Sequence, residues 1–255
     1  MNPTVRIAMW SCSRNCSTAM MRSWGSRSDT TVVDEPLYAA WLLATGAMHP
    51  MRAAILEHHE SDWKAVVASL EGAVPTPILY EKHISKHLCD HMDRAWLRSH
   101  RHAFLIRDPL PMLRSFQRKV DRVTVEETGL PQQAELWSWL DRHLGVQAPV
   151  IDARDLLTSP TVMLPRMADA LGVPFDAAML EWAPGRRDTD GIWAQHWYDA
   201  VERSRAFHPY QESTGSLTPA LQVVHDACLP AYRFLYDRRI RLDDGGASPV
   251  AGSVG

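Results

Sequence analysis

Short apolar runs, separated by longer stretches of mixed character, are the feature that most limits the fold of this 255-residue chain. The first 152 residues contain five such runs, and each is continuous rather than alternating with polar residues. Continuous runs of this length are typical of strands that are buried on both faces of a parallel sheet. We therefore expect strands at Val5–Trp10, Thr31–Asp34, Pro77–Glu81, Ala103–Arg107 and Pro149–Asp152.

The stretches between these runs have the composition of helices. We expect them at Ser17–Arg27, Asp62–Glu71, Asp90–His100, Pro111–Val120 and Gln132–Leu144. Strands that alternate with helices predict an α/β fold with a doubly wound parallel sheet of about five strands. Right-handed crossovers bring the C-terminal ends of all these strands to one edge of the sheet, where ligands bind. The last third predicts helical additions at Pro160–Leu171, Asp176–Glu181, Trp193–Ala206 and Pro219–Arg238.

Length and composition predict one domain over residues 1–242, followed by a flexible tail at 243–255. A chain of this length can bury one large core, and the Gly/Ser/Ala-rich tail lacks the apolar residues to join it. Hydrophobic residues make up 45% and charged residues 22%, as in ordinary soluble proteins. The net charge of −3 provides no overall positive field to attract nucleic acid or an anionic membrane.

Neither a membrane segment nor a secretory signal is expected from the sequence. No stretch approaches the ~18 apolar residues of a membrane span, and the first strand begins almost at once. The four cysteines do not have the spacing of a disulfide framework. Reduced thiols and a cytoplasmic location are therefore the expectation.

The segment Ser11–Thr18 joins the first expected strand to the first expected helix. Against the phosphate loop G-x-x-x-x-G-K-[ST], only Thr18 matches, and Ser17 stands where that loop has lysine. The helix start, with the Ser17 and Thr18 hydroxyls, can still bind one phosphate, and Arg14 adds a forked positive donor. The alternative is that these polar residues only cap the helix.

A second basic position lies at the end of the fourth expected strand. Arg107 ends the run HAFLIR, and Ser115 follows eight residues later on the next expected helix. An arginine at a strand end and a serine on the following helix can converge on one anion. The polar stretch 183–191, expected to be a mobile surface loop, adds Arg186 and Arg187. Two separate phosphate clamps in one site would suit a doubly phosphorylated nucleotide.

On these motifs the chain resembles the cytosolic-type sulfotransferases, which use 3′-phosphoadenosine 5′-phosphosulfate (PAPS) as donor. It is most similar to a bacterial subset with S-R-N-x-S-T-A-M-M-R-S followed by V-x-D-E-P, present here as SRNCSTAMMRS and VVDEP. The similarity covers roughly residues 5 to 207. It implies a P-loop-like fold, PAPS as co-substrate, 3′-phosphoadenosine 5′-phosphate (PAP) as product, and no metal.

The resemblance also implies roles for individual residues. The family's loop for the 5′-phosphosulfate of the donor maps onto Arg14, Asn15, Cys16, Ser17 and Thr18. Its strand-end arginine and downstream serine, which bind the 3′-phosphate, match Arg107 and Ser115. Its late loop R-K-G-x-x-G-D-W-K, which closes on the 3′-phosphate, is matched by Arg186, Arg187, Gly191 and Trp193. Arg14 stands nearest the family's lysine that contacts the leaving group, so it is also a catalytic candidate.

Sulfuryl transfer needs a general base for the acceptor, and two candidates stand at strand ends. Glu35 follows the second strand, and His83 follows the third. Within the resemblance, many members use a histidine in a strand-end K-x-H run, and others use a glutamate after the second strand. Here the run is Lys82-His83, without the intervening residue, and Lys82 is a further catalytic candidate. The sequence leaves both open, with His83 ahead because its ordinary pKa of about 6.5 suits neutral pH. Asp34 is expected to be a structural partner for nearby amides.

The acceptor is expected to be a small, partly apolar molecule. The segments 37–75 and 125–145 are expected to shape its pocket with four tryptophans: Trp41, Trp63, Trp137 and Trp139. A long anionic polysaccharide would need a basic groove. No feature indicates whether oxygen or nitrogen is sulfated, or which oligomeric state the protein adopts.

Three other functions fit parts of the sequence. His83, His87 and His91 recur every four residues, which suggests zinc, but the pattern lacks the glutamate of H-E-x-x-H, and we expect no metal site. A small-molecule kinase would share the fold, but it needs a loop lysine and Mg²⁺ ligands. A non-catalytic nucleotide-binding module would bind the donor or product without turnover.

Overall fold

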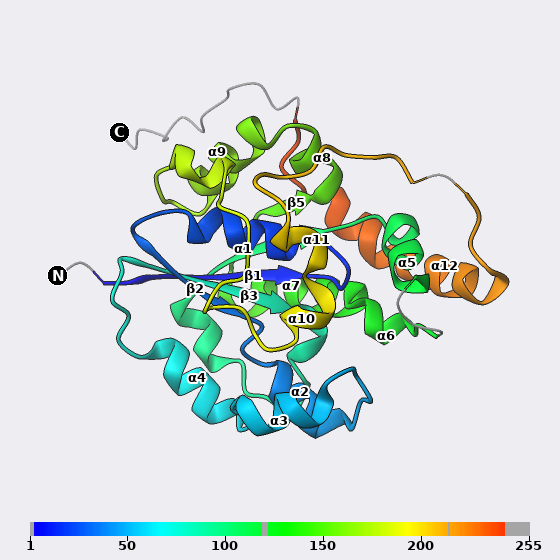
Figure 1. The fold of residues 1–255 in the computed structure, drawn as a ribbon, viewed down its shortest axis with the longest axis horizontal. Coiled ribbons are helices and arrows are strands. Elements are labelled where there is room, and N and C mark those ends of the chain that lie inside the picture. The colour runs from blue at the N-terminus through cyan, green and yellow to red at the C-terminus, as the bar shows by residue number, and fades with distance from the viewer. Residues whose placement is uncertain (1–2, 119–121, 214, 243–255) are drawn as a thin grey trace.

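The computed structural model describes residues 3–118, 122–213 and 215–242 (Figure 1). The predicted tail 243–255 and Val120 lie outside the described residues. The strands form one parallel sheet in the order β2-β3-β1-β4-β5. Their bounds are β1 Val5–Ser11, β2 Thr30–Asp34, β3 Ile78–Ile84, β4 Arg101–Ile106 and β5 Val150–Asp152. The predicted doubly wound α/β fold is confirmed.

Helices cover both faces of this sheet (Figure 1). Helices α1 (Ser17–Gly25) and α9 (Pro160–Ala170) pack with one apolar cluster, and α4 (Trp63–Glu71), α7 (Leu130–Leu144) and α12 (Pro219–Tyr236) pack with another. The remaining α-helices are α2 Tyr38–Thr45, α3 Arg52–His58, α5 Pro109–Gln117, α6 Val125–Thr128, α8 Ala153–Thr158, α10 Ala194–Trp197 and α11 Asp199–Glu202. Three 3₁₀ helices are η1 Ser85–His87, η2 Ala95–Ser99 and η3 Ala177–Leu180.

The central strand β1 shows why the apolar runs are continuous. Ile7 and Met9 point into the cluster beneath α1 and α9, whereas Ala8 and Trp10 point into the cluster on the other face. All four side chains are fully buried. Because successive strand residues point to opposite faces, a strand covered on both sides needs an apolar residue at every position.

Three expected helices differ from the structure. Only η2 is helical within the predicted Asp90–His100 helix, where the Asp93 side chain accepts a hydrogen bond from the Ala95 amide, a local bond that competes with helix formation. The expected helix at Asp176–Glu181 is the 3₁₀ helix η3, which begins after Asp176 caps Ala178. The expected helix over Trp193–Ala206 consists of two short helices, α10 and α11, which meet at Tyr198.

The sheet order brings the ends of four strands together. Strand β1 lies between β3 and β4, and β2 lies beyond β3. The segments that follow β1, β2, β3 and β4 therefore meet at the carboxyl edge, with α10 and α11 in front of them in Figure 1. In open α/β sheets this edge is where ligands bind.

Candidate active site

A cavity of about 590 Å³ lies at this carboxyl edge. Its walls come from the loop after β1, the start of α2, the end of β3, the segment after β4, and α10–α11. Most of the predicted site residues line it: Arg14, Asn15, Cys16, Ser17, Thr18, Glu35, Lys82, Arg107 and Ser115. The fold therefore brings together side chains that are up to about a hundred residues apart in the chain.

The loop after β1 is fixed by Asn15. Its side-chain amide donates to the Leu105 carbonyl of β4 (2.8 Å), and its side-chain oxygen accepts from the Cys16 amide (2.8 Å). The Asn15 side chain, which was predicted to bind the donor, therefore uses both of its polar groups to hold the loop in place. Helix α1 starts without a side-chain cap at Cys16, and no hydrogen bond among the described residues uses the Ser17 or Thr18 hydroxyl. An uncapped first turn leaves backbone amides available to an anion.

Two arginines lie next to each other at the mouth of this loop. The Arg107 guanidinium donates to the Arg14 carbonyl (2.5 Å), and Arg14 Nε donates to Ser115 Oγ (3.2 Å). Neither guanidinium forms an ion pair with a carboxylate of a described residue. Burial, together with the charges of Arg107 and Arg118, lowers the pKa of Arg14. Two like charges without a carboxylate partner form a site for an anion.

This contact corrects the expectation of two separate clamps. Arg14 was placed at the 5′ end of the donor and Ser115 at the 3′ end, but the two side chains touch. The Arg14 side chain also lies over the Trp197 ring, with its guanidinium carbon 5.3 Å from the ring centre. The residues predicted for the two phosphates therefore lie side by side, with Arg14 in contact with both Ser115 and Trp197.

The two cysteines of the loop, Cys12 and Cys16, have buried thiols. Burial raises the pKa of both the Cys12 and the Cys16 thiol to about 12, so both stay protonated at neutral pH. All four cysteines of the chain are free thiols. Cys16 precedes the first residue of α1, and its amide donates to the Asn15 side chain.

A buried charge network forms the opposite wall of the cavity. The Lys82 ammonium, 1% exposed, donates to Asp34 Oδ1 (2.9 Å), Glu35 Oε1 (2.5 Å) and the Tyr198 hydroxyl (2.5 Å). Asp34 also accepts hydrogen bonds from Tyr198 and from the Gly191 amide. Lys82 is thus the buried centre of a network that fixes the Glu35 carboxylate.

Glu35, a predicted candidate for the base, lines the cavity directly after β2. Its backbone has a φ angle of 43°, which only a few non-glycine residues adopt. Burial raises its pKa, while the Lys82 charge opposes that shift. Its second carboxylate oxygen, Oε2, lies 3.8 Å from Nδ1 of His87.

The structure does not bring His83 to the cavity. Strand β3 continues to Ile84, three residues beyond its predicted end, so Lys82 and His83 point to opposite faces of the sheet. The His83 ring stacks on Trp10 at 4.4 Å, and its Nε2 bonds to the Glu81 carboxylate (2.9 Å). His83 belongs to the buried core, and the preference for it over Glu35 was geometrically wrong.

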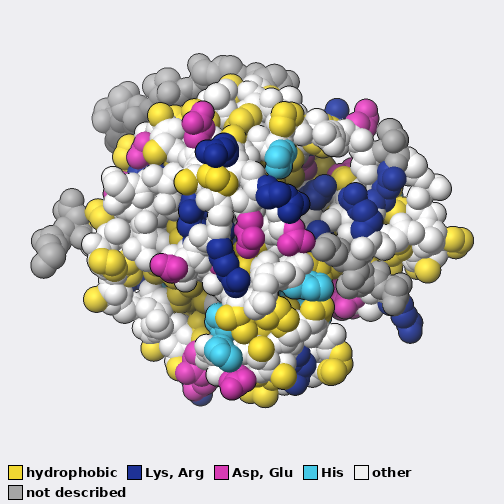
Figure 2. All heavy atoms as spheres, in the orientation of Figure 1, with side chains coloured by type: hydrophobic (Ala, Val, Ile, Leu, Met, Phe, Trp, Pro, Cys, Tyr) yellow, Lys and Arg dark blue, Asp and Glu magenta, His cyan; other side chains and the backbone are white. Residues whose placement is uncertain are grey.

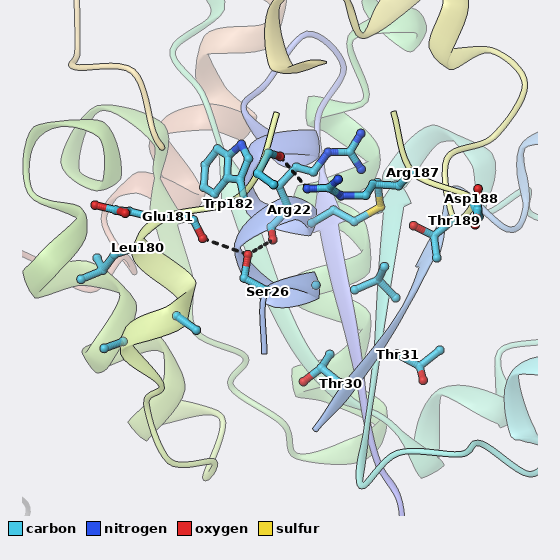
Figure 3. A pocket seen from close by; sticks show the side chains of 16 residues that line it. Arg22, Ser26, Thr30, Thr31, Leu180, Glu181, Trp182, Arg187, Asp188 and Thr189 are labelled. Atoms are coloured by element: carbon cyan, nitrogen blue, oxygen red, sulfur yellow. Dashed lines mark hydrogen bonds between the residues drawn. The ribbon is translucent and has the colours of Figure 1, made fainter. Parts of the chain in front are cut away.

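The two arginines of the late loop do not line the cavity. Arg187 lines a second groove, of about 900 Å³, together with Arg22, as Figure 3 shows. Its guanidinium donates to the Ala183 carbonyl, while Asp190 is held by Arg22 through two bonds of 2.5 and 2.6 Å. Arg186 is exposed and lines neither site.

Gly191 has a packing role instead of a phosphate-binding one. A Cβ atom at this position would lie 2.1 Å from the Trp193 ring, so only glycine fits beneath it. The Gly191 amide donates to Asp34. The predicted assignment of Arg186, Arg187 and Gly191 to a phosphate therefore does not match their positions.

The predicted acceptor wall needs a similar correction. None of the four tryptophans named for it lines the cavity. Trp137 of α7, for example, packs against Phe234 of α12. The segment 37–75 does line the cavity, but through Tyr38 and His49 rather than through its tryptophans. Lys86, His87 and Trp197 also line it and were not assigned from the sequence, although His87 is part of the histidine repeat.

Basic side chains are visible on this face of the molecule. In Figure 2, Lys and Arg side chains gather over the region of α11 and α5, with acidic side chains beside them. No group of three His, Cys, Asp or Glu side chains that could hold a metal occurs among the described residues. None of the described helices is long and apolar enough to cross a membrane.

Known proteins resemble the chain over most of its length. In sequence it is 34% identical, over 230 residues, to branched-chain-amino-acid aminotransferase-like protein 2 of Arabidopsis thaliana. The match covers 90% of this chain but 41% of that protein, so the chain spans about two fifths of its relative.

Two solved structures share the fold. The sulfotransferase domain from the curacin biosynthetic pathway has a TM-score of 0.53 at 14% identity, and covers 89% of this chain and 98% of its own. The sulfotransferase from Alicyclobacillus acidocaldarius has a TM-score of 0.53 at 12% identity, with 94% and 98% covered. Finally, the sulfotransferase domain family matches residues 5–238. The chain therefore belongs to the sulfotransferase domain family.

Proposed function

We propose that this protein transfers the sulfuryl group of PAPS to a hydroxyl or amine of a small acceptor. The observation that carries the proposal is that one cavity joins an anion site to a buried carboxylate. Arg14, Arg107 and the uncapped start of α1 form the anion site, and Glu35 stands on the opposite wall. Family membership supports the reaction type, and the charges of the cavity support the bisphosphate donor.

The donor fits the anion site through both of its phosphate groups. The first turn of α1, with Ser17 and Thr18, would bind the 5′-phosphosulfate, because helix N-termini favour anions. Arg107 and Ser115 would bind the 3′-phosphate with charge-assisted hydrogen bonds. Arg14 lies between them and would stabilise the charge that develops on the leaving phosphate.

Glu35 would act as the base in the transfer step. The acceptor oxygen or nitrogen forms a bond to sulfur while the bond from sulfur to the bridging phosphate oxygen breaks. The acceptor's proton goes to Glu35, and the electron pair of the broken bond leaves with PAP. Lys82, which holds Oε1, would keep the carboxylate oriented so that Oε2 faces the acceptor.

Calorimetric titration with PAP, ATP and AMP, without added metal, tests the donor. We expect micromolar binding of PAP and much weaker binding of the other two. Arg107→Ala should weaken PAP binding by about 10-fold to 100-fold, the range expected for losing charged hydrogen bonds. Arg187→Ala is the matched control, because Arg187 lies at the other groove and should leave PAP affinity unchanged.

The opposite results would decide against the proposal. A preference for ATP that depends on Mg²⁺ would indicate a small-molecule kinase instead. Binding of PAP without sulfate transfer to any acceptor, and without an effect of Glu35→Gln, would indicate a non-catalytic nucleotide-binding module. Equal losses from Arg107→Ala and Arg187→Ala would mean that the late loop does reach the donor.

A further inference from the structure

Lys86 is a buried cation that the transfer mechanism leaves unused. It lies in the 3₁₀ helix η1, directly after β3, and it lines the cavity although only 8% of it is exposed. No described residue gives its ammonium group a hydrogen bond or an ion pair. The ammonium nitrogen lies over the face of the Trp41 ring, 4.5 Å from the ring centre.

The carboxylates nearest to Lys86 are already engaged. Glu35 bonds to Lys82, and Glu127 accepts from the Thr124 amide in the capping box of α6. Both are close enough to raise the pKa of Lys86, but burial dominates and lowers that pKa to about 8. The Lys86 side chain is therefore largely buried, but its ammonium opens onto the cavity without a carboxylate partner among the described residues, and it can bind an anion that arrives with a ligand.

The Lys86 side chain reaches the α2 side of the cavity, where its ammonium nitrogen lies over the ring of Trp41. Its charge acts there on Glu35 and on His49, which come from the segments around α2. The ammonium therefore shares a wall with Glu35, where the proposed transfer would place the acceptor.

We propose that Lys86 anchors the acceptor, and that the acceptor is a small carboxylic acid whose hydroxyl or amino group faces Glu35. This inference rests on the proposed sulfuryl transfer. A single ammonium matches the single charge of a carboxylate, whereas a phosphate group would favour a fork of arginine donors. Met48 and the aromatic Tyr38, which line the cavity, would contact the carbon skeleton between the two polar ends, while Trp41 packs behind the Lys86 ammonium.

The test uses pairs of acceptors that differ only in the charged group. 4-Hydroxyphenylacetate is compared with its amide, and 3-hydroxyhexanoate with its amide, both by calorimetry in the presence of PAP and by sulfate transfer. We expect wild type to favour each acid over its amide by at least about 10-fold, the effect of one charge-assisted hydrogen bond. Lys86→Gln should bring this ratio close to one, and Lys86→Arg should restore most of it.

Lys64→Gln is the matched control. The ammonium nitrogen of Lys64 also lies over a tryptophan ring, 5.8 Å from the centre of Trp63. Lys64 is, however, exposed on α4 and lies outside the cavity. Its loss should leave the preference for acids and the turnover unchanged. The inference would be overturned if wild type bound the acids no better than the amides, or if Lys86→Gln kept the preference.

Two further outcomes separate this inference from the proposed function. A loss of PAP affinity in Lys86→Gln as large as that in Arg107→Ala would place Lys86 on the donor and overturn the inference alone. Conversely, binding of acids that depends on Lys86, without PAP binding or sulfate transfer, would support the carboxylate subsite while the sulfotransferase proposal failed.

Discussion

Glu35 and Arg14 both have a positive φ angle, 43° and 54°, although neither is glycine. Such backbone conformations cost of the order of 1–3 kcal/mol and persist where the surrounding structure holds them. Here the Glu35 amide donates to the Lys82 carbonyl, and the Arg14 carbonyl accepts from Arg107. Both residues line the cavity, and strained backbone conformations held by the surrounding structure are often found at functional sites.

Replacing Glu35 by glutamine should lower kcat by about 100-fold or more, because a positioned base contributes that much. PAP affinity should stay within a factor of about two, since Glu35 does not touch the anion site. In wild type, kcat should fall as the pH decreases, because Glu35 becomes protonated and can no longer accept a proton. Since the pKa of Glu35 is raised, this fall should occur at a higher pH than for an ordinary carboxyl group. Glu181→Gln, an exposed glutamate at the other groove, is the control. A variant at Glu35 that keeps most of its turnover would exclude this role.

The Lys86 ammonium predicts a second pH effect. Its pKa of about 8 means that it loses its charge as the pH rises through 8, so KM for acidic acceptors should increase above that pH while KM for their amides should not. The groups that face it are Glu35, Glu127, His49 and His87. Burial lowers the pKa of both histidines, to about 4 for His49, so neither changes charge in this range. A KM for the acids that stays constant from pH 7 to 9 would contradict the prediction.

At the scale of elements, the pair α10–α11 closes the cavity from the front (Figure 1). Each helix has only four residues, so neither is stable alone and tertiary contacts must hold them. Tyr198, between the two helices, supplies those contacts through Lys82, Asp34 and the indole of Trp193. The same buried network thus orients the base and fixes the segment that carries Trp197 over Arg14.

Removing one hydroxyl tests this coupling. Tyr198→Phe should lower the free energy of unfolding by about 1–3 kcal/mol, because it removes the partner of the buried Trp193 indole N–H and one hydrogen bond each from Lys82 and Asp34. Hydrogen exchange should increase in α10–α11 more than in the central strands. Tyr236→Phe is the control, since no hydrogen bond among the described residues uses its hydroxyl, and it should change stability little. Equal effects of the two substitutions, measured by urea unfolding, would show that the network does not hold these helices.

At the scale of the whole molecule, the apolar runs were sufficient to predict the sheet, because burial on both faces demands them. They failed at the end of β3, where Lys82 and His83 are polar yet lie inside the strand. Each has a buried polar partner: Lys82 donates to Asp34, 48 positions away, and His83 bonds to the neighbouring Glu81, which also bonds to His100. A prediction that assumes polar residues are exposed therefore ends this strand at Glu81 and places His83 beyond it, at the ligand edge.

The late loop shows the same limit over a longer range. Its residues match the family pattern loosely, but Asp190 pairs with Arg22, which is 168 positions away. That buried ion pair fixes the loop beside α1, away from Arg107. Local motifs could identify Arg14, Arg107, Ser115 and Glu35, which lie at strand ends and on the next helix. Pairing between distant charges could not be read from the sequence.

The most direct test of the account is a crystal structure of the protein with PAP bound. The account predicts the 5′-phosphate at the first turn of α1 beside Ser17, and the 3′-phosphate on Arg107 and Ser115. Glu35 should face the 5′-phosphate across the remaining cavity. PAP bound in the groove beside Arg187, or a 5′-phosphate that points away from Glu35, would contradict the claim that one cavity joins donor and base.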